Sequence, residues 1–258
     1  MDFESKIVEL KNISMKYHTP QKETLVIDGL NLDVYSREFV TIVGPSGCGK
    51  STLLSIISGL ISPAKGEVNI GARGLYSINQ QAAYMLQKDY LFDWRNIRQN
   101  VLLGLEIKKK ATEKNKKHAV KLLQKYGLGK FLNCYPHQLS GGMRQKVALI
   151  RTLAVNPKIL LLDEPFSAFD YQTKITISEE VRQIIKKEKK AAILVSHDIS
   201  EAISLSDRVI ILSKRPAKIK KVLKIKFECQ ETDYRQKLKD KKFNGYFDAI
   251  WNELNDDE

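Results

Sequence analysis

The segment from residue 38 to 57 constrains the fold of this chain more than any other. A short run of β-forming residues, Glu38–Val43, ends at the glycine-rich segment Gly44-Pro-Ser-Gly-Cys-Gly-Lys50-Ser51, and Ser51–Ile57 has the spacing of a helix. The glycine-rich segment matches the pattern G-x-x-x-x-G-K-[ST] between a strand and a helix. We therefore expect a phosphate loop, in which backbone N–H groups surround phosphate oxygens ahead of the positive end of a helix. Lys50 is expected to bind the β- and γ-phosphates, and the Ser51 hydroxyl to hold Mg²⁺.

Three further apolar runs predict a parallel β-sheet that includes the strand before the phosphate loop. The runs are short and continuous, as expected for strands buried on both faces, and segments with helical spacing separate them. This alternation of strands and helices is typical of an α/β fold. The expected strands are Ile159–Leu162, Ala191–Val195 and Arg208–Leu212, and the expected helices are Ile175–Lys187 and Ile199–Leu205.

The stretch from residue 88 to 156 interrupts this alternation. It is mainly helix-like, with helices expected at Lys116–Tyr126 and Gly142–Ala154, and it lacks good strand patterns. The sequence therefore predicts a helical subdomain that is inserted into the α/β domain.

The chain beyond Ser213 contains two further patterns. Leu223, Ile225 and Phe227 alternate with lysines, which is typical of a half-buried edge strand whose charges oppose pairing with other chains. Apolar residues between positions 246 and 254 then fall at helical spacing. We expect a helix that caps the core, and a helix that docks onto a partner is the alternative.

Two adjacent carboxylates follow the buried run that ends at Leu162. The carboxyl ends of the strands are the edge at which α/β proteins bind ligands. Asp163 is therefore expected in the Mg²⁺ shell, and Glu164 is placed to orient or deprotonate an attacking water. An isolated Asp-Glu pair is often only a helix N-cap. The phosphate loop upstream favours the catalytic interpretation.

Small residues also open the helix that is expected after Leu139. Ser140, Gly141 and Gly142 precede a segment whose first N–H groups would have no partner within the helix. Such a helix start could be a second anion site or a simple capped helix, and the local sequence fits both.

The composition is that of a folded chain with a basic surface. The 258 residues are 43% hydrophobic, and no apolar run is long enough to cross a bilayer. The acidic start of the chain lacks the pattern of a signal peptide, so we expect a cytoplasmic location. Cys48, Cys134 and Cys229 are expected as reduced thiols, with Cys48 a small filler rather than a redox sensor. The net charge of +13 admits anionic partners, although solvated surface is the simplest interpretation of the lysine clusters.

The phosphate loop, the helix start at Ser140 and the Asp163–Glu164 pair follow one another along the chain. Their types and order resemble those of the nucleotide-binding subunit of ABC transporters, and the resemblance extends from Val8 to about Ser213. The resemblance implies a P-loop NTPase core of the α/β class with an antiparallel β subdomain and an inserted α-helical subdomain. It also implies an ABC ATPase domain over residues 1–213, with the nucleotide-binding core at 1–87 and 157–213 and the helical subdomain, with the signature motif, at 88–156. Residues 214–258 would form the basic edge strand and the amphipathic helix.

The same resemblance implies ATP and Mg²⁺ as ligands and assigns roles to single residues. Gln87 matches the glutamine of the Q-loop, and His197 matches the switch histidine that senses the γ-phosphate and supports Glu164. Tyr17 lies where an aromatic ring stacks on adenine, and Phe169 replaces the leucine that is usual in the D-loop. The expected catalytic residues are Glu164, His197 and Gln87; the ATP-binding residues are Tyr17, Gly44, Pro45, Ser46, Gly47, Cys48, Gly49, Lys50, Ser51 and Thr52; the metal ligands are Ser51, Gln87 and Asp163; the signature residues that face a partner's ATP are Ser140, Gly141, Gly142 and Gln145; and the D-loop residues are Ser167 and Asp170.

The resemblance also implies partners. In that family two subunits enclose two ATP molecules head to tail, so we expect a self-dimer, transmembrane permease subunits and, indirectly, a substrate-binding protein, on the inner face of the cell membrane and without direct contact to nucleic acid. Gln87–Trp94 and Asn100–Glu106 are similar to segments of the ATPases of nitrate, sulfonate and taurine importers, and related subunits serve pyrimidine-type thiamine precursors. Trp94 is expected near the permease-binding groove.

Three other kinds of ATPase are alternatives to an importer subunit. DNA-repair and chromosome-organising ATPases usually carry a long coiled coil between the phosphate loop and the signature, but the segment from Lys50 to Ser140 is short and has no sustained heptads. Ribosome-associated ABC proteins, whose basic linker would bind RNA, typically hold two ATPase units in one chain. An exporter motor remains open, although many exporters fuse membrane helices to the ATPase.

Overall fold

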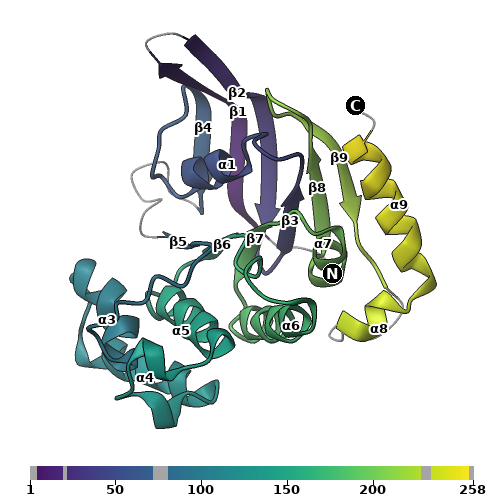
Figure 1. The fold of residues 1–258 in the computed structure, drawn as a ribbon. Helices are drawn as coiled ribbons and strands as arrows, with labels where there is room; N and C mark the ends of the chain where they lie inside the picture. The colour runs from purple at the N-terminus through teal and green to yellow at the C-terminus, as the bar shows by residue number, and fades with distance from the viewer. Residues whose placement is uncertain (1–4, 20–21, 72–80, 228–233, 256–258) are drawn as a thin grey trace.

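The computed structural model describes residues 5–19, 22–71, 81–227 and 234–255. Figure 1 shows a small sheet at the top, a larger sheet with helices in the middle, and a group of helices at the lower left. The small sheet is antiparallel with the strand order β2-β1-β4, which matches the expected antiparallel subdomain. Its strands are β1 (Lys6–Thr19), β2 (Lys22–Tyr35) and β4 (Lys65–Ile70).

The larger sheet has six strands in the order β5-β6-β7-β3-β8-β9. The first five are parallel, and β9 runs antiparallel to β8 at the edge. Successive residues of the central strands pack on opposite faces: Phe39 belongs to the core cluster on the side of the inserted helices, and Val40 to the cluster beneath the small sheet. Burial on both faces explains the continuous apolar runs. The strands are β3 (Phe39–Val43), β5 (Ala82–Met85), β6 (Ile159–Asp163), β7 (Ala191–Val195), β8 (Arg208–Leu212) and β9 (Ile219–Lys224).

Helices cover both faces of this sheet. α1 (Lys50–Ile57) shares a core with the small sheet, whereas α6 (Tyr171–Lys187) packs on the opposite face with the inserted helices. The prediction of the central α/β alternation is therefore confirmed. The helix expected to begin at Ile175 starts four residues earlier, because the carboxylate of Asp170 accepts a hydrogen bond from the N–H of Thr173 and caps it.

The residues between β5 and β6 form the helical group, as predicted. Their caps determine where the helices begin: Asn96 forms a capping box with Gln99, and Thr112 and Ser140 each accept a hydrogen bond from the N–H three residues later. The apolar faces of these helices join the same core cluster as one face of the larger sheet. The helices are α3 (Ile97–Ile107), α4 (Glu113–Lys125) and α5 (Gly141–Ala154), with the 3₁₀ turns η2 (Gly129–Phe131) and η3 (Pro136–Gln138).

The C-terminal part packs on the edge of the larger sheet. α7 (Ile199–Leu205) packs on β3, and α8 (Tyr234–Leu238) packs on α6 and α7. α9 (Lys241–Asn255) packs on β8 and β9 and follows this edge on the right of Figure 1. The expected edge strand is present but displaced: β9 ends at Lys224, so the prediction of a strand through Phe227 was wrong. The N–H of Ile225 instead donates to the carbonyl of Asp207, and Ile225 still packs against the edge cluster. None of the described helices is both long and apolar enough to cross a bilayer.

Candidate ATP site

The phosphate loop connects the end of β3 to the start of α1. Gly47 and Gly49 have φ angles of 72° and 123°, in the region that favours glycine, and a Cβ at Gly49 would lie 2.9 Å from a methyl group of Val26. The side chain of Lys50 is only 7% exposed, and its ammonium donates to the carbonyls of Gly44 at 2.7 Å and Pro45 at 2.9 Å. These contacts hold a buried positive charge at the loop, which is suited to phosphate.

The loop forms one wall of a cavity of about 760 Å³, a volume typical of small-molecule sites. Tyr17 and Thr24 of the small sheet form a second wall. The Tyr17 hydroxyl lies 3.4 Å from that of Thr52, and the Tyr17 side chain is 43% exposed. The full lining consists of Tyr17, Thr24, Val26, Ser46, Gly47, Gly49, Lys50, Ser51, Thr52, Glu164, His197 and Arg215.

Three of the predicted ATP-binding residues are absent from this lining. Gly44 and Pro45 contribute the carbonyls that hold Lys50, and Cys48 is buried behind the loop beside Gly44. Burial raises the pKa of the Cys48 thiol, so the side chain remains a neutral thiol at physiological pH, in line with the filler interpretation. Cys134 is also a free thiol, and Cys229 lies outside the described residues.

The residues expected at the metal bring oxygen atoms together at the end of β6. The Ser51 hydroxyl donates to one carboxylate oxygen of Asp163 at 3.1 Å, and the hydroxyl of Tyr84 donates to the other at 2.8 Å. A hydroxyl and a carboxylate beside a phosphate site form a donor set that fits Mg²⁺, which prefers oxygen ligands and usually keeps several waters. Burial, together with the bond to Asp163, raises the pKa of Tyr84, so its hydroxyl remains a donor.

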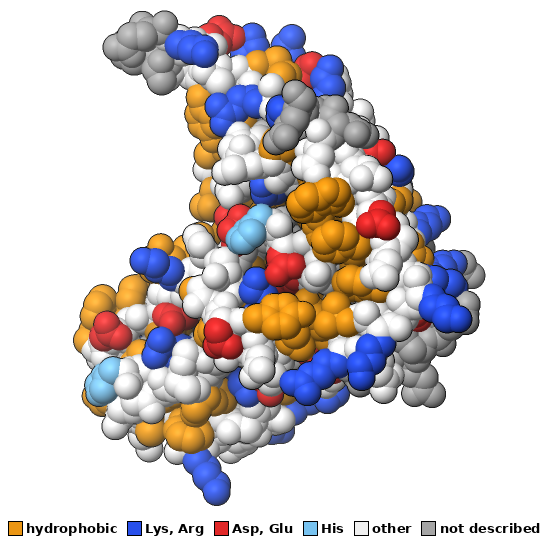
Figure 2. Space-filling model, turned by 45° about the vertical axis from the view of Figure 1, so that its right-hand side comes forward, with side chains coloured by type: hydrophobic (Ala, Val, Ile, Leu, Met, Phe, Trp, Pro, Cys, Tyr) orange, Lys and Arg blue, Asp and Glu red, His pale blue; other side chains and the backbone are white. Residues whose placement is uncertain are grey.

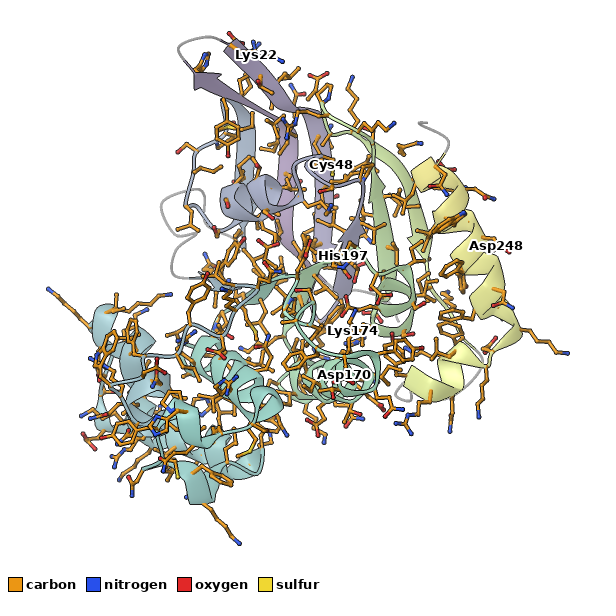
Figure 3. All side chains as sticks on the ribbon, in the orientation of Figure 1. Lys22, Cys48, Asp170, Lys174, His197 and Asp248 are labelled. Atoms are coloured by element: carbon orange, nitrogen blue, oxygen red, sulfur yellow. The ribbon has the colours of Figure 1, made fainter. Side chains whose placement is uncertain are left out.

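Glu164 and His197 face each other across the ends of β6 and β7. His197 Nδ1 lies 3.2 Å from Glu164 Oε2, and both residues line the cavity. The N–H of Glu164 donates to the carbonyl of Val195 at 3.0 Å, which continues the pairing of the two strands as far as Glu164. Figure 3 shows His197 near the centre of the molecule, between Cys48 on the loop side and Lys174 on α6. The structure thus brings together a carboxylate and an imidazole from two different strands.

Gln87 is connected to the same loop by a chain of hydrogen bonds. Its amide donates to the Ser167 hydroxyl at 3.0 Å, and this hydroxyl donates to the carbonyl of Glu164 at 2.9 Å. The Q-loop and D-loop positions therefore meet at the residue expected to activate water. Among the described residues, Ser51 bonds directly to Asp163, whereas the Gln87 amide bonds to Ser167, so two of the three expected metal ligands are in direct contact.

The signature residues surround the start of α5, outside the cavity lining. Ser140 caps the helix by accepting from the N–H of Met143 at 3.3 Å. A Cβ at Gly141 would lie 3.1 Å from the Phe169 ring, and one at Gly142 would lie 2.9 Å from Ile177 of α6, so the start of α5 approaches both side chains closely.

Gln145 differs from the other signature residues. It was expected to face a partner's ATP, but its side chain is only 3% exposed, and its amide donates to the carbonyl of Pro165. In this conformation Gln145 therefore supports the loop that follows Glu164 from inside the subunit. Gln145 is buried because it lies on the face of α5 that packs against the core. The signature motif alone does not show which face of the helix this residue occupies.

Tyr84, Arg215 and Glu201 also belong to the site or its support, and sequence reasoning missed all three. Tyr84 and Arg215 lie on segments without a phosphate-binding pattern. Glu201 is buried in α7 and accepts a hydrogen bond from Ser196, next to His197. The only sequence feature that marks Glu201 is its place in the first turn of a predicted helix. A carboxylate at such a position is usually exposed, so the sequence did not indicate a buried residue near the site.

A phosphate loop with a buried lysine, beside a carboxylate and histidine pair at the ends of parallel strands, defines a nucleotide-binding protein of the P-loop class. The profile of the family described as ABC transporter matches residues 27–167. The chain belongs to this family as an ATP-binding protein with ATPase activity, in agreement with the relatives and solved structures that it resembles.

Two relatives show how much of the chain the likeness covers. The uncharacterized ABC transporter ATP-binding protein YtlC of Bacillus subtilis (strain 168) is 43% identical over 96% of this chain and 95% of its own. The aliphatic sulfonates import ATP-binding protein SsuB of Bacillus cereus is 39% identical over 85% of this chain and 86% of its own.

Solved structures agree with the fold. The dimeric ATP-binding cassette MJ0796, in a post-hydrolysis state bound to ADP and Pi, matches with a TM-score of 0.71 and 31% identity over 85% of this chain and 99% of that one. The cbiO1 protein of Clostridium perfringens, part of the cbiONQ complex, matches with a TM-score of 0.73 over 85% of this chain and 88% of that one, and its 24% identity shows the fold alone.

Proposed function

We propose that this ATPase energises an importer for a small solute of the nitrate, sulfonate or taurine type, or of the pyrimidine-precursor type. The observation that carries the proposal is the 39% identity to a sulfonate import ATP-binding protein over most of both chains. The similarity of Gln87–Trp94 to importer ATPases supports the same direction. The transported solute would be selected by the permease and by an external substrate-binding protein.

Hydrolysis is proposed to take place between the phosphate loop and the Glu164–His197 pair. Lys50 neutralises the charge of the β- and γ-phosphates, while Glu164 orients and deprotonates the attacking water. His197, 3.2 Å from Glu164, positions this carboxylate and donates to the γ-phosphate. Ser51 and Asp163 would hold Mg²⁺, which neutralises the developing negative charge.

The complete site is proposed to need a second subunit. Ser140, Gly141 and Gly142 lie at the start of α5 and do not line the cavity of their own chain. The unpaired N–H groups of this helix start suit a γ-phosphate that another subunit holds, and the solved relative MJ0796 is a dimer. ATP binding would therefore close a head-to-tail dimer, and hydrolysis would reopen it.

The permease is proposed to bind near the Q-loop. Trp94 is 73% exposed and stacks on Phe92 with the ring centroids 4.7 Å apart, and Leu86 and Tyr90 are exposed as well. Large apolar side chains that gather on a surface typically mark an interaction site. Because Gln87 connects this surface to Glu164 through Ser167, closure of the dimer would reach the permease on the inner face of the membrane.

ATP hydrolysis by the purified chain, with and without its candidate permease in lipid, tests this function. We expect the permease to stimulate turnover. Glu164→Gln should reduce turnover to the background level, since it removes the base but preserves the shape of the side chain. Stimulation by DNA or RNA, together with indifference to every permease, would overturn the transport proposal and favour the nucleic-acid alternative.

A further inference from the structure

Arg215 lies at the ATP cavity, although no phosphate-binding motif includes it. It belongs to the loop between β8 and β9, and its guanidinium Nη2 donates to the carbonyl of Gly47 in the phosphate loop at 2.5 Å. It also lines the cavity together with Lys50, Tyr17 and His197. A guanidinium has five N–H donors in a planar fork, so one bond to Gly47 leaves the others available.

The loop that carries Arg215 is fastened to the scaffold on both sides. The N–H of Ala217 donates to the carbonyl of Val26 at 2.8 Å, and the N–H of Asp28 donates to the carbonyl of Ala217 at 3.2 Å. These two bonds connect the loop to β2. The N–H of Ser213 donates to the carbonyl of Lys218 at 2.9 Å and closes the loop. Ala217 itself is fully buried. The backbone beside Arg215 is therefore held in place before any nucleotide binds.

The charge of Arg215 has no carboxylate partner in the described part of the chain. Lys218, three residues further on in the same loop, forms an ion pair with Asp28 at 2.9 Å, whereas the Arg215 guanidinium bonds to the neutral carbonyl of Gly47. A second cation at a cavity that already holds Lys50 is favourable when the ligand carries several negative charges, as the phosphate chain of a nucleotide does.

We propose that Arg215 is a further phosphate-binding residue of the ATP site. One edge of its guanidinium is held by Gly47, and the remaining N–H groups bind the phosphate chain of the nucleotide. Arg215 thereby extends the positive wall of the phosphate loop from the end of β8. The inference rests on the ATP site described above, and not on the identity of the transported solute.

Equilibrium binding of ATP, ADP and adenosine to the full chain and to Arg215→Ala tests the proposal. We expect ATP and ADP to bind about tenfold more weakly, because a charge-assisted bond to phosphate is lost. Adenosine, which has no phosphate, should bind both proteins equally. An unchanged ATP affinity, or an equal loss for adenosine, would overturn the proposal.

Two further variants separate phosphate binding from support of the loop. Arg215→Gln can still donate to the Gly47 carbonyl but has no charge, so it should lose affinity as Arg215→Ala does; full affinity in this variant would show that Arg215 only positions the loop. Lys218→Ala removes one positive charge from the same loop, at a side chain that is 61% exposed, and should leave ATP affinity unchanged. Thermal unfolding without nucleotide should give the same midpoint for the Arg215 variants and the wild type.

A Lys50→Ala variant in the same titrations distinguishes failure of this inference from failure of the ATP site. If Lys50→Ala weakens ATP binding and Arg215→Ala does not, only the inference about Arg215 is wrong. If neither variant weakens it, the ATP site itself is misplaced. Loss of ATP-dependent dimerisation at unchanged nucleotide affinity would show that Arg215 contacts a second subunit instead of phosphate.

Discussion

Glu164 has a backbone φ of 46°, which is uncommon for a residue with a side chain. The following residue, Pro165, disfavours the ordinary helical conformation at Glu164, and the hydrogen bond from the Glu164 N–H to the Val195 carbonyl holds the backbone in place. A conformation of this kind costs on the order of 1 kcal/mol and persists where the surrounding structure determines it. Here it turns the carboxylate toward His197 and the cavity, so the cost falls on the residue that is proposed to activate water.

Glu201 is a second carboxylate near His197, but it is almost completely buried. Burial raises the pKa of Glu201 to about 7, and the nearby Asp198 and Glu164 act in the same direction, against the hydrogen bond from Ser196 and the charge of Lys174. The folded protein therefore binds a proton that the unfolded chain releases between about pH 4.5 and pH 7. Because the unfolded state binds fewer protons in this range, Glu201 lowers stability as the pH rises.

We predict that Glu201→Gln abolishes this loss. The amide keeps a hydrogen-bond acceptor for Ser196 but cannot ionise. Between about pH 4.5 and pH 8, the free energy of unfolding of the wild type should therefore fall by about 3 kcal/mol relative to that of the variant. Urea unfolding at several pH values measures the difference. A difference that does not change with pH would contradict a buried, titrating carboxyl at this position.

At the scale of elements, α9 covers the edge of the larger sheet through one of its faces. Ile250 is fully buried against the cluster of α7 and β8, whereas the neighbouring Trp251 is 52% exposed and stacks on Phe247. Glu253 also pairs with Lys221 of β9 at 2.9 Å. This arrangement agrees with a helix that caps the core, which was the favoured interpretation of its sequence.

Two adjacent substitutions in α9 test this role. Ile250→Ala should lower the free energy of unfolding by about 3 kcal/mol, because it removes buried methyl groups and leaves a cavity. Trp251→Ala should change it by less than about 1 kcal/mol, because half of the side chain is already in water. Denaturant unfolding of both variants gives the comparison. Equal losses would mean that the two faces of α9 are buried to the same extent in solution.

At the scale of the whole molecule, the chain has a net charge of +13. On the face that Figure 2 displays, Lys and Arg side chains are spread along the edges, with Asp and Glu among them. Ion pairs such as Lys146–Glu180 at 2.9 Å and Lys6–Asp33 at 3.0 Å offset part of the charge. On this face the distribution favours a solvated surface, because a nucleic-acid site would gather cations along one path.

Assembly is the property of the whole molecule that nucleotide should control. We predict that Glu164→Gln with ATP and Mg²⁺ doubles its mass in sedimentation, because the uncleaved nucleotide keeps two subunits closed. ADP should leave it at the mass of one chain. The double variant Lys50→Ala, Glu164→Gln is the control and should stay a monomer with ATP. A mass that is independent of nucleotide would contradict closure by two shared ATP molecules.

Local physical chemistry makes the central part of the fold predictable from sequence. Continuous apolar runs gave the bounds of β7 and β8 correctly, since strands buried on both faces need apolar residues at every position. The phosphate loop was equally clear, because the glycines and the lysine that form it are close together in the sequence and at fixed spacing. The long strands β1 and β2 were not located individually, because their ladder has several register shifts and large exposed stretches that obscure the alternation.

The sequence by itself therefore determined the α/β class, the phosphate loop and the residues that lie directly after buried strands. Only the tertiary structure showed that Tyr84 bonds Asp163 across 79 positions, that Arg215 reaches Gly47 across 168, and that Gln145 is buried against Pro165. The physical reason is that these contacts depend on the order in which strands lie side by side and on which face of a helix meets the core. Neither property leaves a pattern in the residues nearby in the chain, whereas loop geometry and strand burial do.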